Sequence, residues 1–241
     1  MKRITDAPPL LVFGAHPDDI EFGCGAVVIQ EARAGRRVHL VVGSKGEAAT
    51  NGTPARRARE AREAARILGA TLEFAELGGD TRFERSPRWA RGLAGIIRRV
   101  RPGTVLAPTL EENQHPDHAV LGALVRDACR LARYGGVREL RAWAPHAVGQ
   151  LFYYVVTPEA EPATGARVLV DVSADAVIAD WVRAMEAHAS QLRTRNYVEL
   201  QLTRARLHGL RAGVGHAVPL FPADPLLVGS LAALGTAARR F

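Results

Sequence analysis

Four short apolar runs, each followed by a segment with helical periodicity, constrain the fold of the first half of the chain. The apolar runs span residues 10–15, 37–43, 71–77 and 104–107. The helical segments span residues 20–34, 53–68, 88–100 and 117–133. Short apolar runs are typical of buried strands, and strands that alternate with helices form a parallel sheet with right-handed crossovers. We therefore predict an α/β fold: a Rossmann-like, doubly wound, mostly parallel sheet with helices on both faces.

The second half of the chain is less regular. The predicted elements there are strands at residues 150–156 and 168–172, helices at residues 175–191 and 198–210, and a candidate last helix at residues 226–234. A length of 241 residues suits one large domain or two small ones, and the sequence has no clear interdomain linker. We predict a single domain over residues 1–241, in which a Rossmann-like core (10–135) is followed by a less regular C-terminal extension (136–241) that completes the pocket.

The net charge of +7 raises the question of nucleic-acid binding. Only two of the 32 basic residues are lysines, and the arginines are spread along the whole chain. Many alternate with glutamate, as in residues 57–63 (RAREARE), a pattern typical of a solvated helix face with pairs three and four residues apart. We therefore expect no nucleic-acid partner. A positive field that attracts a small anionic substrate explains the charge equally well.

No stretch of the sequence approaches the roughly 18 consecutive apolar residues that a membrane span needs. The N-terminal apolar run is also too short for the core of a signal peptide. We therefore expect a cytoplasmic protein without a membrane partner. The two cysteines, Cys24 and Cys129, lie far apart in different predicted elements, so a disulfide framework is not expected.

Four residues suited to metal chemistry follow the first predicted strand: His16, Asp18, Asp19 and Glu21. A helix-like turn would place His16 and Asp19 on one side, and both side chains are good zinc donors. Asp18 stands between them, where it can act as a base on a bound water. The alternative is that one aspartate only caps the following helix. Capping needs a single aspartate, however, and does not explain a histidine with three acids.

A second cluster, His115, Asp117 and His118, follows the fourth predicted strand. Taken alone, it is equally explained by a polar loop in which Asp117 caps a helix. In a doubly wound sheet, however, the carboxyl ends of the strands share one edge, and ligands bind there. We therefore predict that the two clusters form one metal site. Together they exceed the three protein ligands of a catalytic zinc, so the surplus groups can serve as base, acid and orienting partner.

The loop over residues 46–53 leads into a predicted helix that carries Arg56 and Arg57, and it contains Glu47. A helix N-terminus with an arginine is a natural anion clamp, but a helix that is simply rich in charge explains the pattern as well. His188 and Gln191 stand one helical turn apart and could reach the same edge of the sheet.

These motifs resemble a known family. Residues 15–25 (AHPDDIEFGCG) and 115–118 (HPDH) resemble the signatures of the LmbE-like, or PIG-L, de-N-acetylases, and residues 46–63 resemble that family's second loop and helix. The resemblance spans at least residues 10–135. It implies a metal-dependent N-deacetylase that hydrolyses the N-acetyl group of an N-acetylglucosamine-type substrate and releases acetate and a free amine.

The resemblance also implies a metal and its ligands. His16, Asp19 and His118 are the implied zinc ligands, and Asp18 is the implied general base on the water that the metal binds. A donor set of two histidines and one aspartate also accepts Fe²⁺, Co²⁺ or Mn²⁺, so the loaded metal does not follow from the ligands alone. A chain without any divalent metal would instead favour a non-catalytic Rossmann-like module for a sugar or nucleotide.

Further roles follow from the same resemblance. His115 is the implied protonated group that stabilises the oxyanion or donates to the leaving amine, and Asp117 is implied to orient His115. The expected substrate-binding residues are Arg57, Glu47 and His188. Arg57 resembles the arginine that meets the substrate's acidic group, although that placement is open by one position.

The C-terminal half narrows the resemblance. Residues 134–136, 145–146, 151–154 and 188–191 look like the bacillithiol-biosynthesis branch, whose members deacetylate N-acetylglucosaminyl malate. Other substrates of the same chemistry remain alternatives: a thiol-conjugate amide, a chito-oligosaccharide or an antibiotic precursor. The family often has an acidic residue where this chain reads residues 216–219 (HAVP), which bears on the substrate pocket. Family members often form trimers or hexamers, so a homo-oligomer is expected.

Overall fold

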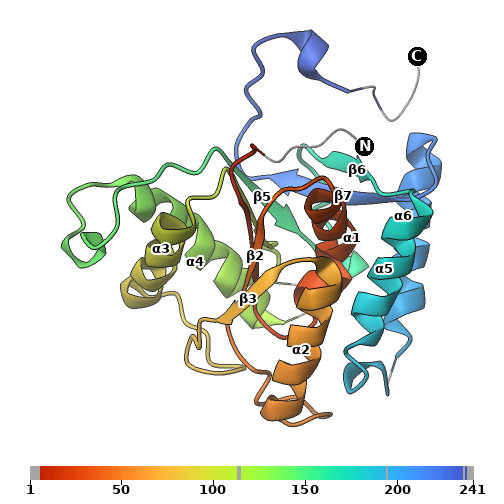
Figure 1. Cartoon of the computed structure of the whole chain (residues 1–241), viewed down its shortest axis with the longest axis horizontal. Coiled ribbons are helices and arrows are strands. Elements are labelled where there is room, and N and C mark those ends of the chain that lie inside the picture. Colours follow the sequence, from red (N-terminus) through yellow and green to blue (C-terminus); the bar gives the residue numbers. More distant parts are fainter. Residues whose placement is uncertain (1–5, 113–114, 194, 236, 238–241) are drawn as a thin grey trace.

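The computed structural model describes residues 6–112, 115–193, 195–235 and 237. Its centre is a seven-stranded sheet with the strand order β3-β2-β1-β4-β5-β7-β6 (Figure 1). The strands are β1 (Leu10–Gly14), β2 (Val38–Val42), β3 (Thr71–Phe74), β4 (Thr104–Pro108), β5 (Gln150–Tyr154), β6 (Val168–Asp171) and β7 (Ala217–Pro222). Strands β1 to β5 pair in parallel, and β7 pairs antiparallel with both β5 and β6. The predicted mostly parallel α/β sheet is confirmed.

Six helices cover the two faces of this sheet (Figure 1). They are α1 (Asp19–Arg33), α2 (Pro54–Leu68), α3 (Pro87–Val100), α4 (Pro116–Arg133), α5 (Asp175–Glu186) and α6 (Tyr197–Ala212). Helices α3 and α4 pack on one face with the side chains of Leu11 and Phe13 from β1. Helices α1, α2, α5 and α6 pack on the other face, where Leu10 and Val12 contribute to the core. Strand β1 is therefore buried on both sides, which explains its unbroken apolar sequence.

Local signals set the starts of two helices, α2 and α3. Thr53 caps α2 by accepting a hydrogen bond from the amide of Arg56 (3.3 Å), and Pro54 stands in the first turn. Ser86 caps α3 in the same way, followed by Pro87. Both starts follow the pattern of a capping hydroxyl with proline in the first helical turn.

The C-terminal half departs from the sequence prediction in three places. Strand β7 was not predicted, because Pro219 and Pro222 interrupt an otherwise apolar run and proline argues against a strand inside a sheet. The helix predicted over residues 175–191 ends at Glu186. The candidate helix over residues 226–234 is wrong, since only a short 3₁₀ turn, η4 (Leu231–Ala233), forms there.

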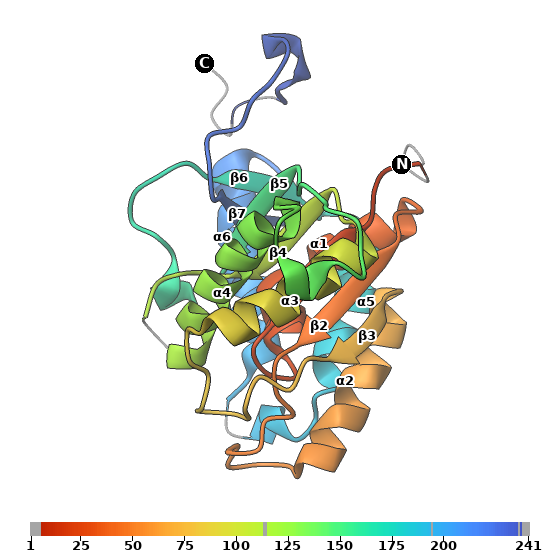
Figure 2. The ribbon, with the colours of Figure 1, turned by 90° about the vertical axis from the view of Figure 1, so that its left-hand side faces the viewer.

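The segment that follows β7 runs away from the sheet in both views (Figures 1 and 2). Leu227 in this segment is 98% exposed, so its side chain has no face of the protein to pack against. Helices of this length depend on packing of an apolar face, which explains why none forms here. Among the described residues, none of the helices combines the length and the apolar character that crossing a membrane requires.

Candidate metal centre

Strand order in the sheet reverses between β1 and β4, and the sequence clusters lie at the carboxyl ends of these two strands. This is the switch point where ligands bind in doubly wound folds. His16 and Asp19 follow β1, and His118 lies in the first turn of α4, after β4. Nε2 of His118 lies 3.1 Å from Oδ1 of Asp19, and Nδ1 of His16 lies 3.6 Å from Oδ2 of the same carboxylate.

The three residues converge closely enough to hold one ion. Each offers a ligand atom, and these atoms all lie within 4.8 Å of one another, with all three residues buried. Two imidazole nitrogens and one carboxylate oxygen are the donor set of a catalytic divalent-metal site with an open position. The donors His16, Asp19 and His118 therefore fit a divalent cation.

Asp19 also fixes the turn that carries the site. Its Oδ2 accepts hydrogen bonds from the backbone amides of Ala15 (2.8 Å) and His16 (2.9 Å). Burial alone would raise the pKa of Asp19, but His118 and His16 outweigh that effect and hold the pKa well below its usual value. The carboxylate is thus charged and pinned in place before any ligand binds.

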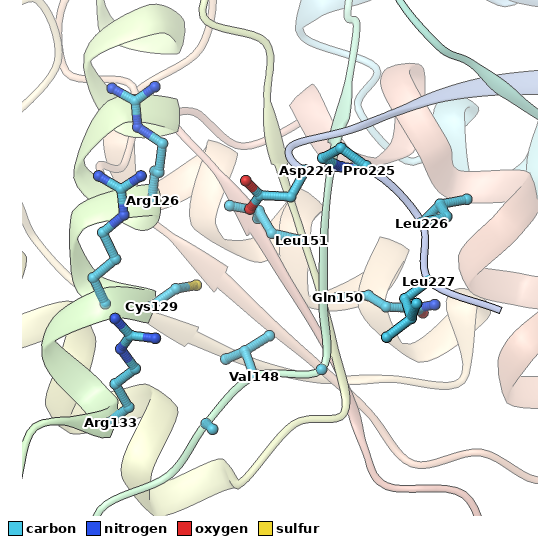
Figure 3. A pocket seen from close by; sticks show the side chains of 13 residues that line it. Arg126, Cys129, Arg133, Val148, Gln150, Leu151, Asp224, Pro225, Leu226 and Leu227 are labelled. Atoms are coloured by element: carbon cyan, nitrogen blue, oxygen red, sulfur yellow. The ribbon is translucent and has the colours of Figure 1, made fainter. Parts of the chain in front are cut away.

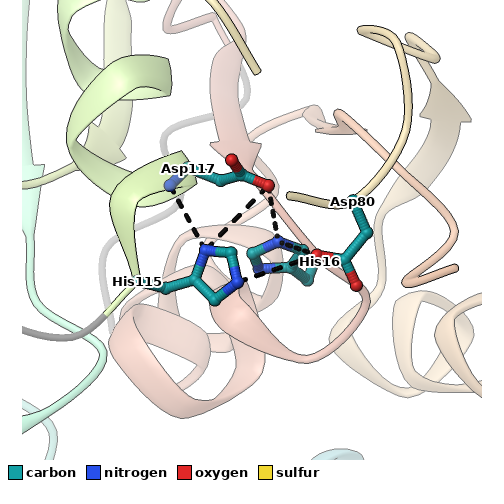
Figure 4. Close-up of side chains that lie close together, drawn as sticks. All are labelled: His16, Asp80, His115 and Asp117. Carbon is teal, nitrogen blue, oxygen red and sulfur yellow. Dashed lines mark hydrogen bonds and ion pairs between the residues drawn. The ribbon is translucent and has the colours of Figure 1, made fainter. Parts of the chain in front are cut away.

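The far nitrogen of His16 meets two further carboxylates (Figure 4). Nε2 of His16 lies 3.1 Å from Oδ1 of Asp80 and 3.2 Å from Oδ2 of Asp117. Burial disfavours a charged imidazole, yet Asp19, Asp117 and Asp80 together raise the pKa of His16 well above its usual value. Carboxylates on the outer nitrogen of a ligating histidine fix the orientation of its ring.

Asp80 was missed by the sequence analysis. It lies in the loop after β3, is buried, and accepts a hydrogen bond on Oδ2 from the amide of Ala48 (3.2 Å). A lone aspartate after two glycines has no local signature of a site. The one usable signal was its position, because β3 is parallel to β1 and its carboxyl end faces the same edge of the sheet.

His115 and Asp117 lie beside this group (Figure 4). The amide of Asp117 donates to Nδ1 of His115 (3.2 Å), while its carboxylate lies 3.9 Å from that nitrogen and accepts from the amide of Thr81 (2.7 Å). The carboxylate of Asp117 is therefore closer to His16 than to His115. His115 lines the pocket above the cluster, and burial, followed by the charge of His16, lowers its pKa below the usual value.

Asp18 has an unusual backbone and a largely buried carboxyl. Its φ of 117° lies in the left-handed region, which side chains rarely adopt, and its side chain makes no capping hydrogen bond to α1. Oδ2 of Asp18 lies 3.2 Å from Nη2 of Arg57. Burial raises the pKa of Asp18 to about 6, against the opposing charge of Arg57. The capping alternative therefore does not describe Asp18, and backbone strain of this kind tends to occur at functional sites.

The two arginines of the 46–57 region point to different places. Arg57 is buried, lines the pocket, and donates to the carbonyl oxygen of Pro17 (2.8 Å) as well as contacting Asp18. Arg56 instead pairs with Glu60 along the helix, with Nε 2.9 Å from Oε1. The residue of the pair that reaches the site is Arg57.

Two residues expected to bind substrate lie outside the pocket beside the metal cluster. Glu47 accepts hydrogen bonds from the amides of Lys45 (3.0 Å) and Asp80 (2.9 Å), so its carboxylate braces the loop that carries Asp80. His188 is 0% exposed and faces Glu21, with Nε2 3.4 Å from Oε2. Neither side chain lines this pocket, and a substrate-binding role for Glu47 or His188 stays a prediction.

Gln191, three residues after His188, does line the pocket, as do Phe22 and Tyr197. Nε2 of Gln191 donates to the carbonyl oxygen of Asn51 (2.7 Å), which connects this part of the pocket to the loop before α2. The pocket has a volume of about 300 Å³ and is lined by aromatic as well as charged side chains. Such a lining suits a small polar molecule with a ring.

The fold and the cluster fit a metal-dependent hydrolase, and comparison with known proteins defines the class further. A family model described as GlcNAc-PI de-N-acetylase (PIG-L) matches residues 11–129. The crystal structure of the conserved protein TT1542 from Thermus thermophilus is 32% identical, covers 91% of this chain and 96% of that chain, and superposes with a TM-score of 0.78. This chain belongs to the GlcNAc-PI de-N-acetylase (PIG-L) family.

Relatives with assigned activities are enzymes of two kinds. The diacetylchitobiose deacetylase of Thermococcus kodakarensis is 29% identical over 203 residues, which cover 79% of this chain and 72% of the relative. The 4-oxalmesaconate hydratase of Pseudomonas putida is 31% identical over 146 residues, which cover 56% of each protein. Like these relatives, this chain is an enzyme.

Proposed function

We propose that this enzyme is a zinc-dependent N-deacetylase that hydrolyses the N-acetyl group of an N-acetylglucosamine-type sugar to acetate and a free amine. The observation that carries the proposal is the convergence of His16, Asp19 and His118 beside Asp18 on the floor of an open pocket. The family description and the similarity to a diacetylchitobiose deacetylase support an acetylated amino sugar as the substrate.

His16, Asp19 and His118 would hold the metal. A bound zinc ion supplies Lewis acidity for the acetyl carbonyl and lowers the pKa of water, and Fe²⁺ in the same donor set would do the same. Asp80 and Asp117 would keep the ring of His16 aligned for this task, because both contact its Nε2.

Asp18 is the proposed general base. A carboxyl with a pKa of about 6 is ionised at neutral pH and still basic enough to take the proton of the attacking water. Arg57 holds this carboxylate at 3.2 Å and at the same time bonds to the turn before it. Arg57 is also the proposed contact for an acidic group of the substrate, since it is the buried cation that lines the pocket.

His115 is the proposed group that stabilises the oxyanion. Its Nδ1 accepts a hydrogen bond from the amide of Asp117, so the proton of the neutral ring sits on Nε2, and the side chain is partly exposed to the pocket. Nε2 of His115 can therefore donate a hydrogen bond to the developing oxyanion. As the amide C–N bond breaks, Asp18 passes the proton that it took from the attacking water to the nitrogen, which leaves as an amine, and the acyl carbon leaves as acetate. Asp117 thus serves His115 through its amide and His16 through its carboxylate.

The finer proposal concerns the substrate and the assembly. We propose N-acetylglucosaminyl malate, the substrate of the bacillithiol-biosynthesis branch, whose malate carboxylates would suit the positive charge of Arg57. A homo-oligomer, trimer or hexamer, is proposed on the family resemblance.

The similarity to a hydratase supports one competing reaction, addition of water to a carbon–carbon double bond, for which the same base and metal would serve.

A substrate panel tests this proposal, with acetate release as the readout for the acetylated sugars and loss of ultraviolet absorbance as the readout for hydration of a double bond. The panel holds N-acetylglucosaminyl malate, diacetylchitobiose, N-acetylglucosamine and an unsaturated dicarboxylic acid, each with and without a chelator. We expect chelator-sensitive acetate release, with the highest kcat/KM for the malate glycoside. Highest kcat/KM on diacetylchitobiose would retain the deacetylase and reject the malate substrate. Turnover of the unsaturated acid alone would reject the deacetylase.

A further inference from the structure

A second pocket opens at the opposite edge of the sheet from the metal centre. It has a volume of about 470 Å³ and is lined by the second half of α4, the start of β5 and the segment after β7. Gln150 lies at this pocket, whereas Val156, six residues further along the same strand direction, lines the pocket at the metal centre. At ~3.3 Å per residue the two sites are roughly 20 Å apart. This second pocket is therefore separate from the active site.

Three arginines of α4 form one wall of this pocket (Figure 3). Arg126, Arg130 and Arg133 recur at intervals of four and three residues, which places them on one helix face. Within the described part of the chain, Arg126 and Arg130 form no ion pair, and Nε of Arg126 is buried without a hydrogen-bond partner. A buried donor without an acceptor is costly, so an anion that accepts from Nε of Arg126 would be favourable at this wall.

The floor next to these arginines carries no charge. Burial raises the pKa of the Cys129 thiol to about 12, and it also raises the pKa of Tyr153, so both groups stay protonated. Tyr153 lies two residues beyond Leu151 on the same face of β5, and its hydroxyl is buried without a hydrogen-bond partner. Tyr153 is itself only 7% exposed. Tyr153 does not itself line the pocket, so Cys129 is the one of these two uncharged groups that contributes to its floor.

The remaining wall is mainly apolar. Val148, Leu151, Leu226 and Leu227 line it, and the last two stand exposed at the rim (Figure 3). Asp224 is the one acidic residue among those that line the pocket. Three arginines against one aspartate leave a net charge of +2 in the pocket, which matches the charge of a phosphate monoester dianion.

We propose that this pocket is a binding site for a phosphate monoester that carries an apolar group. The guanidinium groups of Arg126 and Arg130 donate to the phosphate oxygens, an arrangement that the planar fork of arginine favours. The apolar group lies against Val148 and Leu151, on the side where Leu226 and Leu227 leave apolar surface uncovered. Asp224 weakens the site, because its carboxylate faces the same anion.

Isothermal titration of the metal-loaded protein with three probes tests this site: phenyl phosphate, inorganic phosphate and benzoate. We expect phenyl phosphate to bind most tightly, because inorganic phosphate lacks the apolar group and benzoate carries half the charge. The double variant Arg126→Gln/Arg130→Gln should weaken phenyl phosphate binding by about tenfold or more, since each lost charge-assisted hydrogen bond is worth about one order of magnitude. The matched control is Arg59→Gln/Arg211→Gln, which removes two exposed arginines outside the pocket.

Asp224→Asn provides an independent readout of opposite sign. Removal of the one acid should tighten phenyl phosphate binding several-fold, whereas arginines with a purely structural role would leave the affinity unchanged. This arm stands even if the double arginine variant proves unstable, which its thermal midpoint without ligand would reveal. If neither the double arginine variant nor Asp224→Asn alters the affinity for phenyl phosphate, the anion binds elsewhere, for example at the metal. That result would overturn the proposal.

Discussion

Carboxylates contact the imidazole of His16 at both of its nitrogens. Asp19 lies near Nδ1, and Asp80 and Asp117 lie near Nε2, all within 3.6 Å. This arrangement leaves the ring little freedom to rotate. Asp80 and Asp117 therefore help to keep Nδ1 of His16 directed towards Asp19 and His118, although neither carboxylate needs to contact a metal. The same outer partners make the metal affinity of the site depend on more than its three donors.

Replacement of Asp80 tests this dependence. Asp80→Asn keeps the size of the side chain but removes the negative charge beside Nε2 of His16, so we expect zinc affinity to fall about 10- to 100-fold. Competition with a chromogenic chelator measures the affinity. Glu84→Gln, at an exposed residue of the same loop, is the control and should leave it unchanged. Equal affinity in both variants would show that Asp80 does not tune the site.

The carboxyl of Asp18 yields a pH prediction. A general base works in its ionised form, and the pKa of Asp18 is raised to about 6, so activity should rise with pH through about 6. Asp18→Asn should retain the metal, lose about 10²- to 10⁴-fold in kcat, and lose this acid limb. Acetate release across pH 4.5–8, with metal content measured on the same samples, checks all three effects.

The exposed Asp175→Asn serves as the matched control for that experiment and should behave as wild type. An Asp18→Asn enzyme with undiminished turnover would remove Asp18 from the proposed chemistry.

At the scale of elements, α6 forms hydrogen bonds with the residues that follow β5, where Val156 lines the pocket at the metal centre. Arg204 donates to the carbonyl oxygen of Val155 (2.9 Å) and Gln201 to that of Val156 (2.7 Å). Arg204 and His208 also hold Glu161, whose Oε1 lies 2.7 Å from Nε of Arg204 and 2.9 Å from Nε2 of His208. A partly buried ionic cluster therefore holds α6 against the end of β5 and the segment that follows it.

Glu161 makes this connection pH-dependent. Burial alone would raise the pKa of Glu161, but His208 and Arg204 lower it to about 2, below its value of 4.5 in the absence of such contacts. Because the folded pKa is depressed, the stabilisation is complete above about pH 4.5 and is lost as the pH falls towards 2. We expect a loss on the order of 1–2 kcal/mol in the free energy of unfolding, after allowance for solvent screening.

Urea unfolding at pH 3 and pH 6 measures this effect. Glu161→Gln should be less stable than wild type at pH 6, and the difference between the two proteins should shrink at pH 3. The exposed Glu186→Gln should show the pH dependence of wild type. A constant difference between Glu161→Gln and wild type across this range would argue that the residue acts through packing and not through its charge.

At the scale of the whole molecule, the sheet topology decides which distant residues lie close together. The switch between β1 and β4 assembles the metal cluster from residues about 100 positions apart, and the opposite edge assembles the arginine pocket from α4, β5 and the segment after β7. The prediction that all 241 residues form one domain stays a prediction. A ligand that binds only the assembled cluster should stabilise the folded state, because the unfolded chain cannot offer the same three donors.

Metal removal tests this coupling. At a metal concentration of about 100 times Kd, binding adds about 2.7 kcal/mol, and a chain of this size shifts by roughly 2–4 °C per kcal/mol. We therefore expect a chelator to lower the melting temperature by about 5–10 °C. His118→Ala, which removes one donor, should melt at the same temperature with and without chelator. A wild-type protein insensitive to chelation would contradict metal binding at this cluster.

The sequence alone determined the features that depend on local chemistry. The apolar runs and the helical periodicity predicted the first four strands and their helices, because each of these signals acts within a few residues. The convergence of His16, Asp19 and His118 also followed, since parallel strands share one carboxyl edge and both motifs directly follow a strand.

Only the tertiary structure decided the rest. Strand β7 forms despite its prolines because β5 and β6 pair with it on either side, and α5 ends at Glu186 where Ser190 bonds instead to Glu60, 130 residues away. Asp80 joins the site, and Glu47 and His188 stay outside it, through contacts between distant segments. Such contacts leave no periodicity in the sequence, because they depend on which loops the folded sheet brings together.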